Sequence, residues 1–176
     1  CTMSTLFVNN LNTASGSTIT IPTGKTLKAT DTPIVGAGNV IQVLQVENPT
    51  TVVGTNSTSF TATGHTISIT PKYSSSKILV TLTGGQITYS SVDKLRVRFY
   101  RKIGTGGYSD ITGDIERISL NSTYDFGHSA SYLDSPSTTS TVIYQPYYRS
   151  ANGNTVYYDY NQVDTNAMLT VMEIAQ

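Results

Sequence analysis

The feature that most constrains the fold is a period of two among the apolar residues between positions 39 and 85. In residues 65–70 and again in residues 77–83, Ile, Val or Leu occupies every second position, mostly between polar neighbours. Such alternation predicts half-buried β-strands, because successive side chains of a strand point to opposite faces. Gly, Pro, Asn and Ser residues that favour turns separate the runs. The pattern predicts the start of an antiparallel β-sandwich.

Residues 40–46 follow a different pattern. Ile41, Val43 and Leu44 place apolar groups on both faces of the predicted strand. This is typical of a strand that is buried on both faces. We expect it to lie either between two layers of one subunit or between one layer and a neighbouring subunit.

Strand patterns continue to the end of the chain, and no sustained helical period occurs. The predicted strands are residues 86–89, 93–103, 108–120, 126–133, 140–149, 155–160 and 167–174. Ile111, Ile115 and Ile118 are expected to face inward, with a break near Gly113. The Asn-Gly sequence in residues 150–154 predicts a hairpin between the strands on either side of it. The last strand is expected to pair centrally in its sheet. Eight to ten strands after Gly38 fit an all-β, jelly-roll-like sandwich.

Residues 1–37 contain only short strand-like pieces separated by Gly and Pro turns. Pieces of this length bury too little surface to be stable alone, so the segment needs partners. We expect a shaft or arm at an interface between subunits, or else an arm along its own sandwich. The predicted organisation is an N-terminal segment of residues 1–37 and a sandwich of residues 38–176. The residues expected at a subunit interface are Leu6, Val8, Ile19, Ile21, Ile41 and Val43.

The composition excludes several classes of function. Charged residues make up 12% of the 176 residues and the formal net charge is zero, which disfavours nucleic acid as a partner. A single cysteine rules out a disulfide within the chain, and no apolar run is long enough to predict a span across a membrane. His65 and His128 fit polar residues at strand ends, and no metal or cofactor motif is present. No spacing of nucleophile and base predicts an enzyme.

Residues 93–103 predict a strand with one basic face, formed by Lys94, Arg96 and Arg98. One interpretation is a patch that binds acidic sugars or phosphates. The favoured interpretation is a solvated face whose charges pair with carboxylates on the next strand, because acidic and basic residues are equal in number. The carboxylates in question are Asp110, Asp114 and Glu116.

Tyrosine is enriched near the C-terminus. The chain has twelve tyrosines and no tryptophan, and half of the tyrosines fall within residues 144–160. Tyrosine offers a large, rigid contact surface with a polar tip, which suits the binding of sugars or proteins, but aromatic residues also pack well inside sheets. Neighbouring tyrosines must face opposite sides, so at most half share one surface. The candidate binding surface comprises Tyr144, Tyr147, Tyr148, Arg149, Tyr157, Tyr158, Asp159 and Tyr160.

Five segments resemble small structural proteins of tailed bacteriophages, particularly marine phages. They are STLFVNNLNTASGSTITIPTGKTL (residues 4–27), GNVIQVLQV (38–46), SFTATGHTISITPKYSSSKILVTLTG (59–84), SYLDSPST (131–138) and LTVMEIAQ (169–176). The segments are spread over nearly the whole chain. They are scaffold motifs and identify no catalytic or binding residue.

The resemblance implies a homotrimeric tail-fibre, head-fibre or capsid decoration protein. Its relatives carry an N-terminal attachment or shaft segment and a C-terminal jelly-roll knob, similar to the heads of tumour necrosis factor or C1q. We therefore expect a virion location, other virion proteins as partners of the N-terminal segment, and possible adhesion to a host-surface glycan. Because little sequence precedes the sandwich, a short fibre, spike or capsid decoration is favoured. A carbohydrate-binding module or lectin is the alternative.

Overall fold

The computed structural model describes residues 23–24, 36–48, 53–89, 91–120, 126–160 and 166–176. The chain divides into two units, Cys1–Ile34 and Val35–Gln176, and each is considered by itself. Only Thr23 and Gly24 of the first unit are described, so the predicted boundary between residues 37 and 38 stays a prediction. The predicted interface residues Leu6, Val8, Ile19 and Ile21 lie outside the described residues.

The described part of the second unit contains twelve β-strands and no helix. The strands are β1 (Val40–Glu47), β2 (Val53–Thr55), β3 (Thr61–Ala62), β4 (Ile67–Ile69), β5 (Lys77–Tyr89), β6 (Asp93–Ile103), β7 (Ser109–Asp110), β8 (Glu116–Leu120), β9 (Phe126–Asp134), β10 (Val142–Ser150), β11 (Val156–Asp159) and β12 (Ala167–Ile174). The all-β prediction is confirmed. The count exceeds the predicted eight to ten because it includes β2, β3 and β7. These strands have only two or three residues each, too few to be predicted as separate strands from the sequence.

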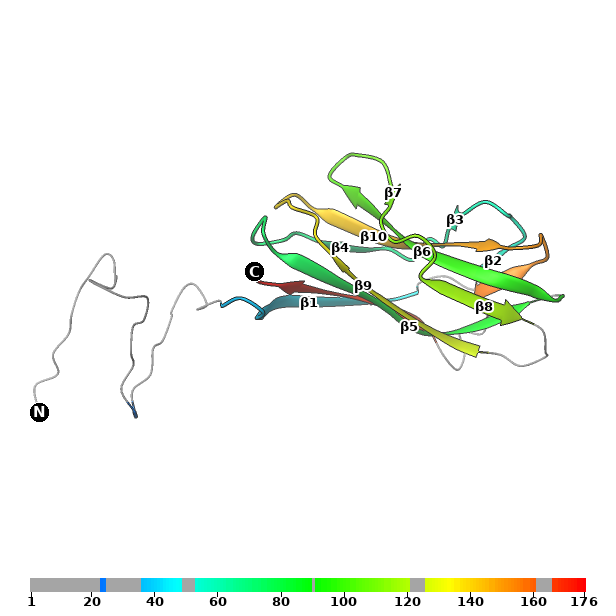
Figure 1. Ribbon diagram of the computed structural model, residues 1–176, viewed down its shortest axis with the longest axis horizontal. Coiled ribbons are helices and arrows are strands. Elements are labelled where there is room, and N and C mark those ends of the chain that lie inside the picture. Colours follow the sequence, from blue (N-terminus) through cyan, green and yellow to red (C-terminus); the bar gives the residue numbers. More distant parts are fainter. Residues whose placement is uncertain (1–22, 25–35, 49–52, 90, 121–125, 161–165) are drawn as a thin grey trace, which may run out of the picture. The chain divides into compact units, whose positions relative to one another are not determined.

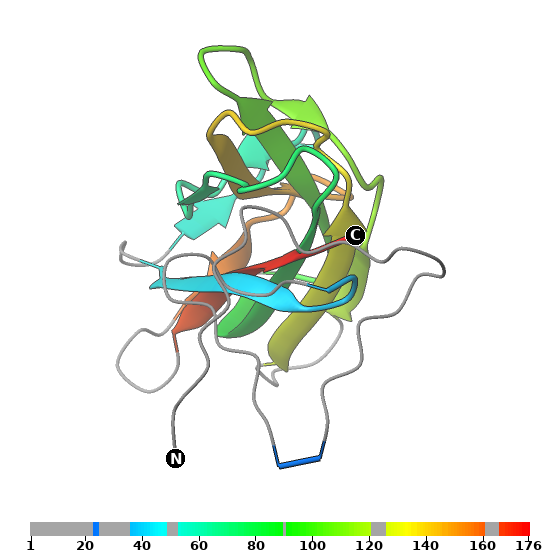
Figure 2. The same ribbon diagram turned by 90° about the vertical axis from the view of Figure 1, so that its left-hand side faces the viewer.

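The strands form two antiparallel sheets that pack as two layers (Figures 1 and 2). In the first sheet β12 lies between β1 and β5, β9 pairs with the other edge of β5, and β11 links the end of β5 to β2. In the second sheet β10 lies between β6 and the short strands β3 and β4, while β7 and β8 pair with the far edge of β6. The orders β1-β12-β5-β9 and β4-β10-β6-β8 are those of a jelly roll. The central position of the C-terminal strand is confirmed.

The core lies between the inner faces of the two sheets. Every second residue is buried along residues 78–82 of β5 and residues 93–99 of β6, including Ile78, Val80 and Leu82 from β5 and Val97 and Phe99 from β6. The predicted inward residues Ile111, Ile115 and Ile118 are partly buried against this core, so that prediction is confirmed. The alternation read from the sequence therefore sorts side chains between core and surface.

The predicted hairpin across residues 150–154 is wrong. β10 belongs to the second sheet and β11 to the first, so the segment between them crosses from one layer to the other. Its backbone winds around the buried carboxylate of Asp93, which accepts hydrogen bonds from the N–H groups of Ala151, Asn152 and Asn154. This long-range contact replaces the local return that the Asn-Gly sequence favours.

One other boundary differs from the predictions. Residues 77–83 and 86–89 form one continuous strand, β5, in which Gly84 and Gly85 adopt positive φ angles at an irregularity in the pairing with β9. The break predicted near Gly113 is confirmed, because residues 108–120 form two short strands, β7 and β8, separated around Gly113, which also has a positive φ. Glycine tolerates this conformation because it lacks a Cβ.

β1 is the edge strand next to β12, and among the described residues it is not buried between two layers. Val40, Val43 and Leu44 are 53%, 52% and 40% exposed, while Ile41 is half-buried. The first of the two expectations for this strand, burial between two layers of one subunit, is therefore wrong. Contact with a neighbouring subunit remains a prediction.

Candidate functional site

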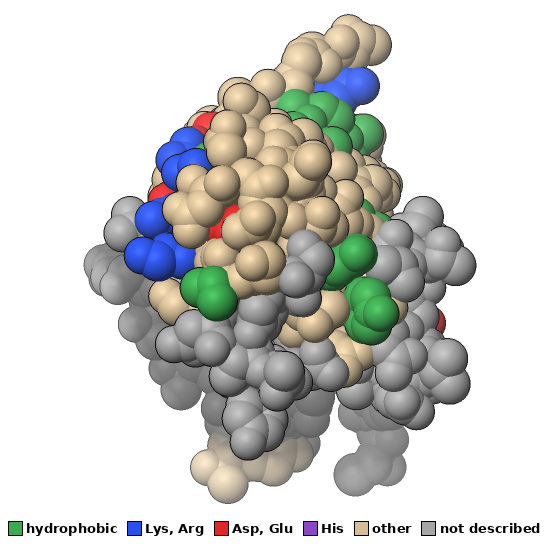
Figure 3. All heavy atoms as spheres, turned by 90° about the vertical axis from the view of Figure 1, so that its right-hand side faces the viewer, with side chains coloured by type: hydrophobic (Ala, Val, Ile, Leu, Met, Phe, Trp, Pro, Cys, Tyr) green, Lys and Arg blue, Asp and Glu red, His purple; other side chains and the backbone are tan. Residues whose placement is uncertain are grey.

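The outer face of the second sheet combines aromatic and basic side chains. Alternation places Arg96, Arg98, Tyr100 and Lys102 of β6 on the same face as Tyr147 and Arg149 of β10, because residues 95, 97 and 99 and residues 144, 148 and 150 fill the interior. Tyr108 and Phe60 pack onto this surface from adjacent loops. We call these eight residues the aromatic-basic face. Figure 3 shows Lys and Arg side chains gathered along one side of the molecule, with Asp and Glu among them.

Three tyrosines form one half of the aromatic-basic face. The rings of Tyr100 and Tyr147 stack with centroids 3.9 Å apart and an interplanar angle of 21°. Tyr108 lies 6.0 Å from Tyr147, and the Lys102 ammonium lies 5.9 Å from the Tyr108 ring. Burial raises the pKa of Tyr147, and the neighbouring Tyr108 and Tyr100 hydroxyls raise it further. The cluster is therefore a neutral aromatic platform beside a positive charge.

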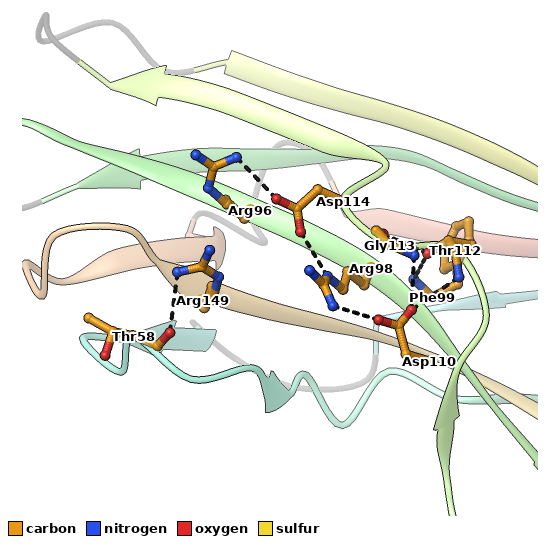
Figure 4. Close-up of polar contacts among 9 residues, drawn as sticks. All are labelled: Thr58, Arg96, Arg98, Phe99, Asp110, Thr112, Gly113, Asp114 and Arg149. Atoms are coloured by element: carbon orange, nitrogen blue, oxygen red, sulfur yellow. Dashed lines mark hydrogen bonds and ion pairs between the residues drawn. The ribbon is translucent and has the colours of Figure 1, made fainter.

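In the other half of the aromatic-basic face, arginines pair with two neighbouring aspartates (Figure 4). Arg98 donates to Asp114 at 2.7 Å and to Asp110 at 2.6 Å, and Arg96 donates to Asp114 at 3.1 Å. These hydrogen bonds, with Asp114 first, raise the pKa of Arg98. Burial alone would raise the pKa of Asp110, but N–H donors from Thr112 and Gly113 and the Arg98 guanidinium outweigh it and lower that pKa. The predicted ion pairs are confirmed for Asp110 and Asp114, whereas the side chain of Glu116 lies outside the described part.

Arg149 occupies a different position from the paired arginines. It donates to the Thr58 carbonyl oxygen at 3.3 Å. The centroid of the Phe60 ring lies 5.2 Å from the guanidinium of Arg149 and 4.2 Å from that of Arg98. Within the part of the chain that the structure describes, neither Arg149 nor Lys102 forms an ion pair with a carboxylate. The face therefore keeps two positive charges that its own aspartates do not neutralise.

Four residues of the predicted tyrosine surface are buried. Tyr144 and Tyr158 are fully buried, Tyr148 is 2% exposed, and burial raises the pKa of Tyr148 to about 12. The Tyr144 hydroxyl donates to Asp134 at 2.7 Å, and the same carboxylate binds Arg101. Buried Asp159 accepts bonds from the Asn48 side chain and from the backbone N–H groups of Gln86 and Ala167. These four residues therefore pack inside the sandwich, which is the second of the two roles that the sequence left open.

Tyr157 and Tyr160 lie in and after β11, which belongs to the first sheet, and so they are separate from Tyr147. Their rings meet edge to face with centroids 4.9 Å apart, and Tyr160 is 45% exposed. Tyr157 packs directly over Gly54 of β2, where an added Cβ would lie 2.7 Å from the ring. The candidate binding residues are therefore divided between two sheets, and of these residues only Tyr147 and Arg149 share the aromatic-basic face.

Sequence reasoning missed Tyr100 and Tyr108. The signal for Tyr100 was present, because it follows Arg98 by two residues and so lies on the same face of the predicted strand. What brings it against Tyr147 is the pairing of β6 with β10, in which Pro146 lies opposite Phe99 and Tyr147 opposite Arg98. That register joins segments far apart in sequence, and a single sequence does not encode it locally.

The outer face of the first sheet has the opposite character. One register row crosses four strands and is entirely apolar, with Val43 opposite Met172, Met172 opposite Leu79 and Leu79 opposite Leu133. The two ends of this apolar row, Val43 and Leu133, are 52% and 46% exposed. The adjacent row on the same face consists of the uncharged residues Gln45, Thr170, Thr81 and Ser131.

His65 was predicted to be a polar residue at a strand end, and the prediction did not include its burial. The side chain is fully buried, with Nδ1 3.1 Å from the Tyr158 hydroxyl and Nε2 3.1 Å from the Val46 carbonyl oxygen. It thus ties β1 and β11 to the segment before β4. Among the described residues, no group of three or more His, Cys, Asp or Glu side chains is arranged to hold a metal ion. No helix of the described part is long and apolar enough to span a membrane.

Comparison with known proteins gives distant structural likenesses, among them a xylan-binding domain and a viral chain. No family model and no curated protein sequence matches the chain. The CBM22-1 xylan-binding domain of Paenibacillus barcinonensis Xyn10C is 11% identical with a TM-score of 0.38, over 80% of this chain and 97% of that domain. A chain in the structure of infectious bursal disease virus, Gx strain, is 9% identical with a TM-score of 0.28, over 80% of this chain and 41% of that one. Both likenesses are too distant to bear on function.

Proposed function

We propose that this chain is a non-enzymatic structural protein of a virion, a homotrimeric short fibre, spike or capsid decoration that is attached through its N-terminal segment and exposes the sandwich. The resemblance to phage structural proteins supports the virion assignment and the trimeric state. The observation that carries the self-association is the apolar row Val43-Met172-Leu79-Leu133 on the outer face of the first sheet.

The apolar row is suited to contact with a second copy of the chain. It offers a continuous apolar strip across β1, β12, β5 and β9, and burial of such surface is worth roughly 25 cal/mol per Å². The flanking row of Thr, Ser and Gln side chains adds hydrogen-bonding groups without the desolvation cost of a charge. Three copies that share this face would cover the apolar row that each copy alone leaves exposed. Many copies on one particle would make weak individual contacts sufficient for attachment to a host surface.

The decisive measurement is the solution mass by light scattering on a sizing column. We expect a trimer for the full chain and a loss of the trimer for Val43→Glu, because a carboxylate would be buried in the apolar row without a partner. Val92→Glu is the matched control, since Val92 is 62% exposed in the segment between β5 and β6 and lies outside the row. A monomeric full chain, or a Val43→Glu variant that stays trimeric, would contradict the proposal.

A carbohydrate-binding module is the second candidate, and the stacked pair Tyr100 and Tyr147 with adjacent Tyr108 is the observation that favours it. Flat aromatic surfaces with polar tips suit the apolar faces of sugar rings. We expect hits on a glycan array for the full chain and loss of those hits for Tyr147→Ala. Tyr73→Ala is the control, because Tyr73 is 42% exposed and lies outside the aromatic-basic face. An array without hits would exclude this candidate and leave the structural role untouched.

A further inference from the structure

We propose that the aromatic-basic face binds an anionic polysaccharide, whose sugar rings lie on Tyr100 and Tyr147 and whose carboxylate or sulfate groups are held by Arg149 with Arg96 at one end and by Lys102 at the other. This inference rests on the carbohydrate-binding candidate of the proposed function and names the class of glycan.

The arginine end has an unbalanced pair of charges. Arg149 lies directly opposite Arg96 in the pairing of β10 with β6. Like charges at directly opposed positions of a sheet are destabilising. Asp114 neutralises the Arg96 side of the pair, but among the described residues Arg149 has only the Thr58 carbonyl oxygen and the Phe60 ring as partners. An anion beside Arg149 would therefore relieve a repulsion that the protein leaves in place.

Hydrogen-bond donors remain available at this end. Arg149 uses one Nη atom for Thr58, and Arg96 uses one Nη atom for Asp114. The Nε of Arg96 is buried, so a ligand can reach only the other nitrogen atoms of the two guanidinium groups. A guanidinium presents its donors in a planar fork that matches the two oxygens of a carboxylate or sulfate group. The arrangement favours a bound anionic group over a solvated surface.

The arginine end is also held in place before any ligand arrives. Phe60 lies against both Arg98 and Arg149, at 4.2 and 5.2 Å, and Arg98 is fixed further by Asp110 and Asp114. Figure 4 shows Arg96, Arg98 and Arg149 on one face of the sheet, with Asp114 between Arg96 and Arg98. Ordering these side chains in advance reduces the entropy that binding must overcome.

The spacing along the strands favours a chain of sugars over a single anion. Tyr147 and Arg149 are two residues apart on one face of β10, or about 7 Å along the strand. Tyr100 and Lys102 have the same relation on β6. The tyrosine platform is thus flanked by positive charge on both sides, with Arg149 at one end and Lys102 at the other. A polysaccharide with repeated negative groups meets both charges while its rings cover the tyrosines.

The test is affinity electrophoresis of the full chain in gels that contain alginate, dextran sulfate, neutral dextran or single-stranded poly(dT). We expect retardation by alginate, dextran sulfate or both, weaker at higher salt because the contact is partly electrostatic, and none by dextran. The first two gels distinguish carboxylate from sulfate as the preferred group. Retardation by dextran equal to that by the acidic polymers, no retardation in any gel, or stronger retardation by poly(dT) would each overturn the inference.

Variants connect the binding to the proposed residues. We expect Arg149→Gln to weaken binding of the acidic polymer about tenfold, the size of one lost charge-assisted contact, and Arg149→Lys to have an intermediate effect because it keeps the charge and loses the fork. Lys72→Gln removes the same charge from an exposed loop residue and should change little. Equal affinities for Arg149→Gln and Lys72→Gln, with unchanged melting temperatures, would overturn the inference.

Failure of this inference is distinguishable from failure of the proposed function. If Tyr147→Ala abolishes binding to a neutral glycan on the array while Arg149→Gln changes nothing, carbohydrate binding stands and the anionic class falls. The mass of the Val43→Glu variant tests the structural role by itself, because Val43 lies on the other sheet.

Discussion

At the scale of single residues, Asp93 contributes more to the fold than its place at the start of β6 indicates. The residue is 2% exposed, and its carboxylate accepts bonds from the Ser150 hydroxyl and from the backbone N–H groups of Lys94, Ala151, Asn152 and Asn154. These contacts hold the segment by which the chain passes from β10 to β11, that is, from one sheet to the other.

The hydrogen bonds to Asp93 predict a pH dependence of stability. Burial opposes ionisation, but the bonds from Ser150, Lys94, Asn154 and Asn152 outweigh it and lower the pKa of Asp93. A lowered folded-state pKa gives stability that is complete above the unfolded pKa of about 4 and is lost as the pH falls through the folded value. Asp93→Asn should lower the free energy of unfolding at pH 7 by about 2–3 kcal/mol, measured by urea denaturation, and flatten its fall below pH 4.

Asn152→Ala is the control for Asp93→Asn. It alters the same segment, but only the backbone N–H of Asn152 contacts Asp93, and its side chain is exposed. Its stability should match that of the natural chain. A similar loss in both variants, or an unchanged acid limb in Asp93→Asn, would show that the carboxylate does not hold the segment.

The sequence predicts which tyrosines oppose one another but not which of them are buried. Tyr147 and Tyr148 face opposite sides, as do Tyr157 and Tyr158, and alternation alone establishes this. Burial of Tyr148 and Tyr158 depends on which face of each strand meets the other sheet. The role of Asp93 is equally invisible, because its partners lie about sixty residues away in residues 150–154.

At the scale of elements, the most accurate prediction is β6, whose bounds Asp93–Ile103 match the predicted residues 93–103. A long, uninterrupted alternation bounded by turn residues contains its own limits. The prediction of a hairpin at the Asn-Gly sequence before β11 failed, because the tertiary contact with Asp93 overrides the local turn signal. It also failed at Gly84-Gly85, where the turn-like pair continues β5 as a bulge.

The bulge in β5 predicts a glycine requirement. Gly84 has a φ of 78°, and an added Cβ would lie 2.7 Å from the backbone oxygen of Asn166. We expect Gly84→Ala to lower the free energy of unfolding by about 1–3 kcal/mol through backbone strain and that contact. Gly107→Ala is the matched control, because Gly107 has no positive φ and a Cβ added there would have no atom within 4 Å. Equal thermal midpoints for the two variants would mean that β5 can relax around the substitution.

At the scale of the whole molecule, composition and alternation together predict the all-β sandwich, because a chain without helical period must bury its strand faces against one another. The strand order β1-β12-β5-β9 and the division of the tyrosines between two sheets follow from pairings that join distant parts of the chain. The apolar row arises in the same way, since Val43, Leu79, Leu133 and Met172 come from four separate strands.

The proposed trimer predicts a specific result for a chain that begins at Gly38. Its sandwich should fold, because β1 remains complete and the N–H of Gly38 still donates to the Ala175 carbonyl oxygen at 2.8 Å. We expect an unchanged β-sheet circular dichroism spectrum and a trimer that dissociates at higher protein concentration than the full chain does. The reason is that residues 1–37 are predicted to add interface, while the apolar row keeps part of it. Equal dissociation of both chains in light scattering would place the N-terminal segment outside the interface and favour an arm along its own sandwich. An unfolded short chain would instead show that the predicted boundary at residue 38 is wrong.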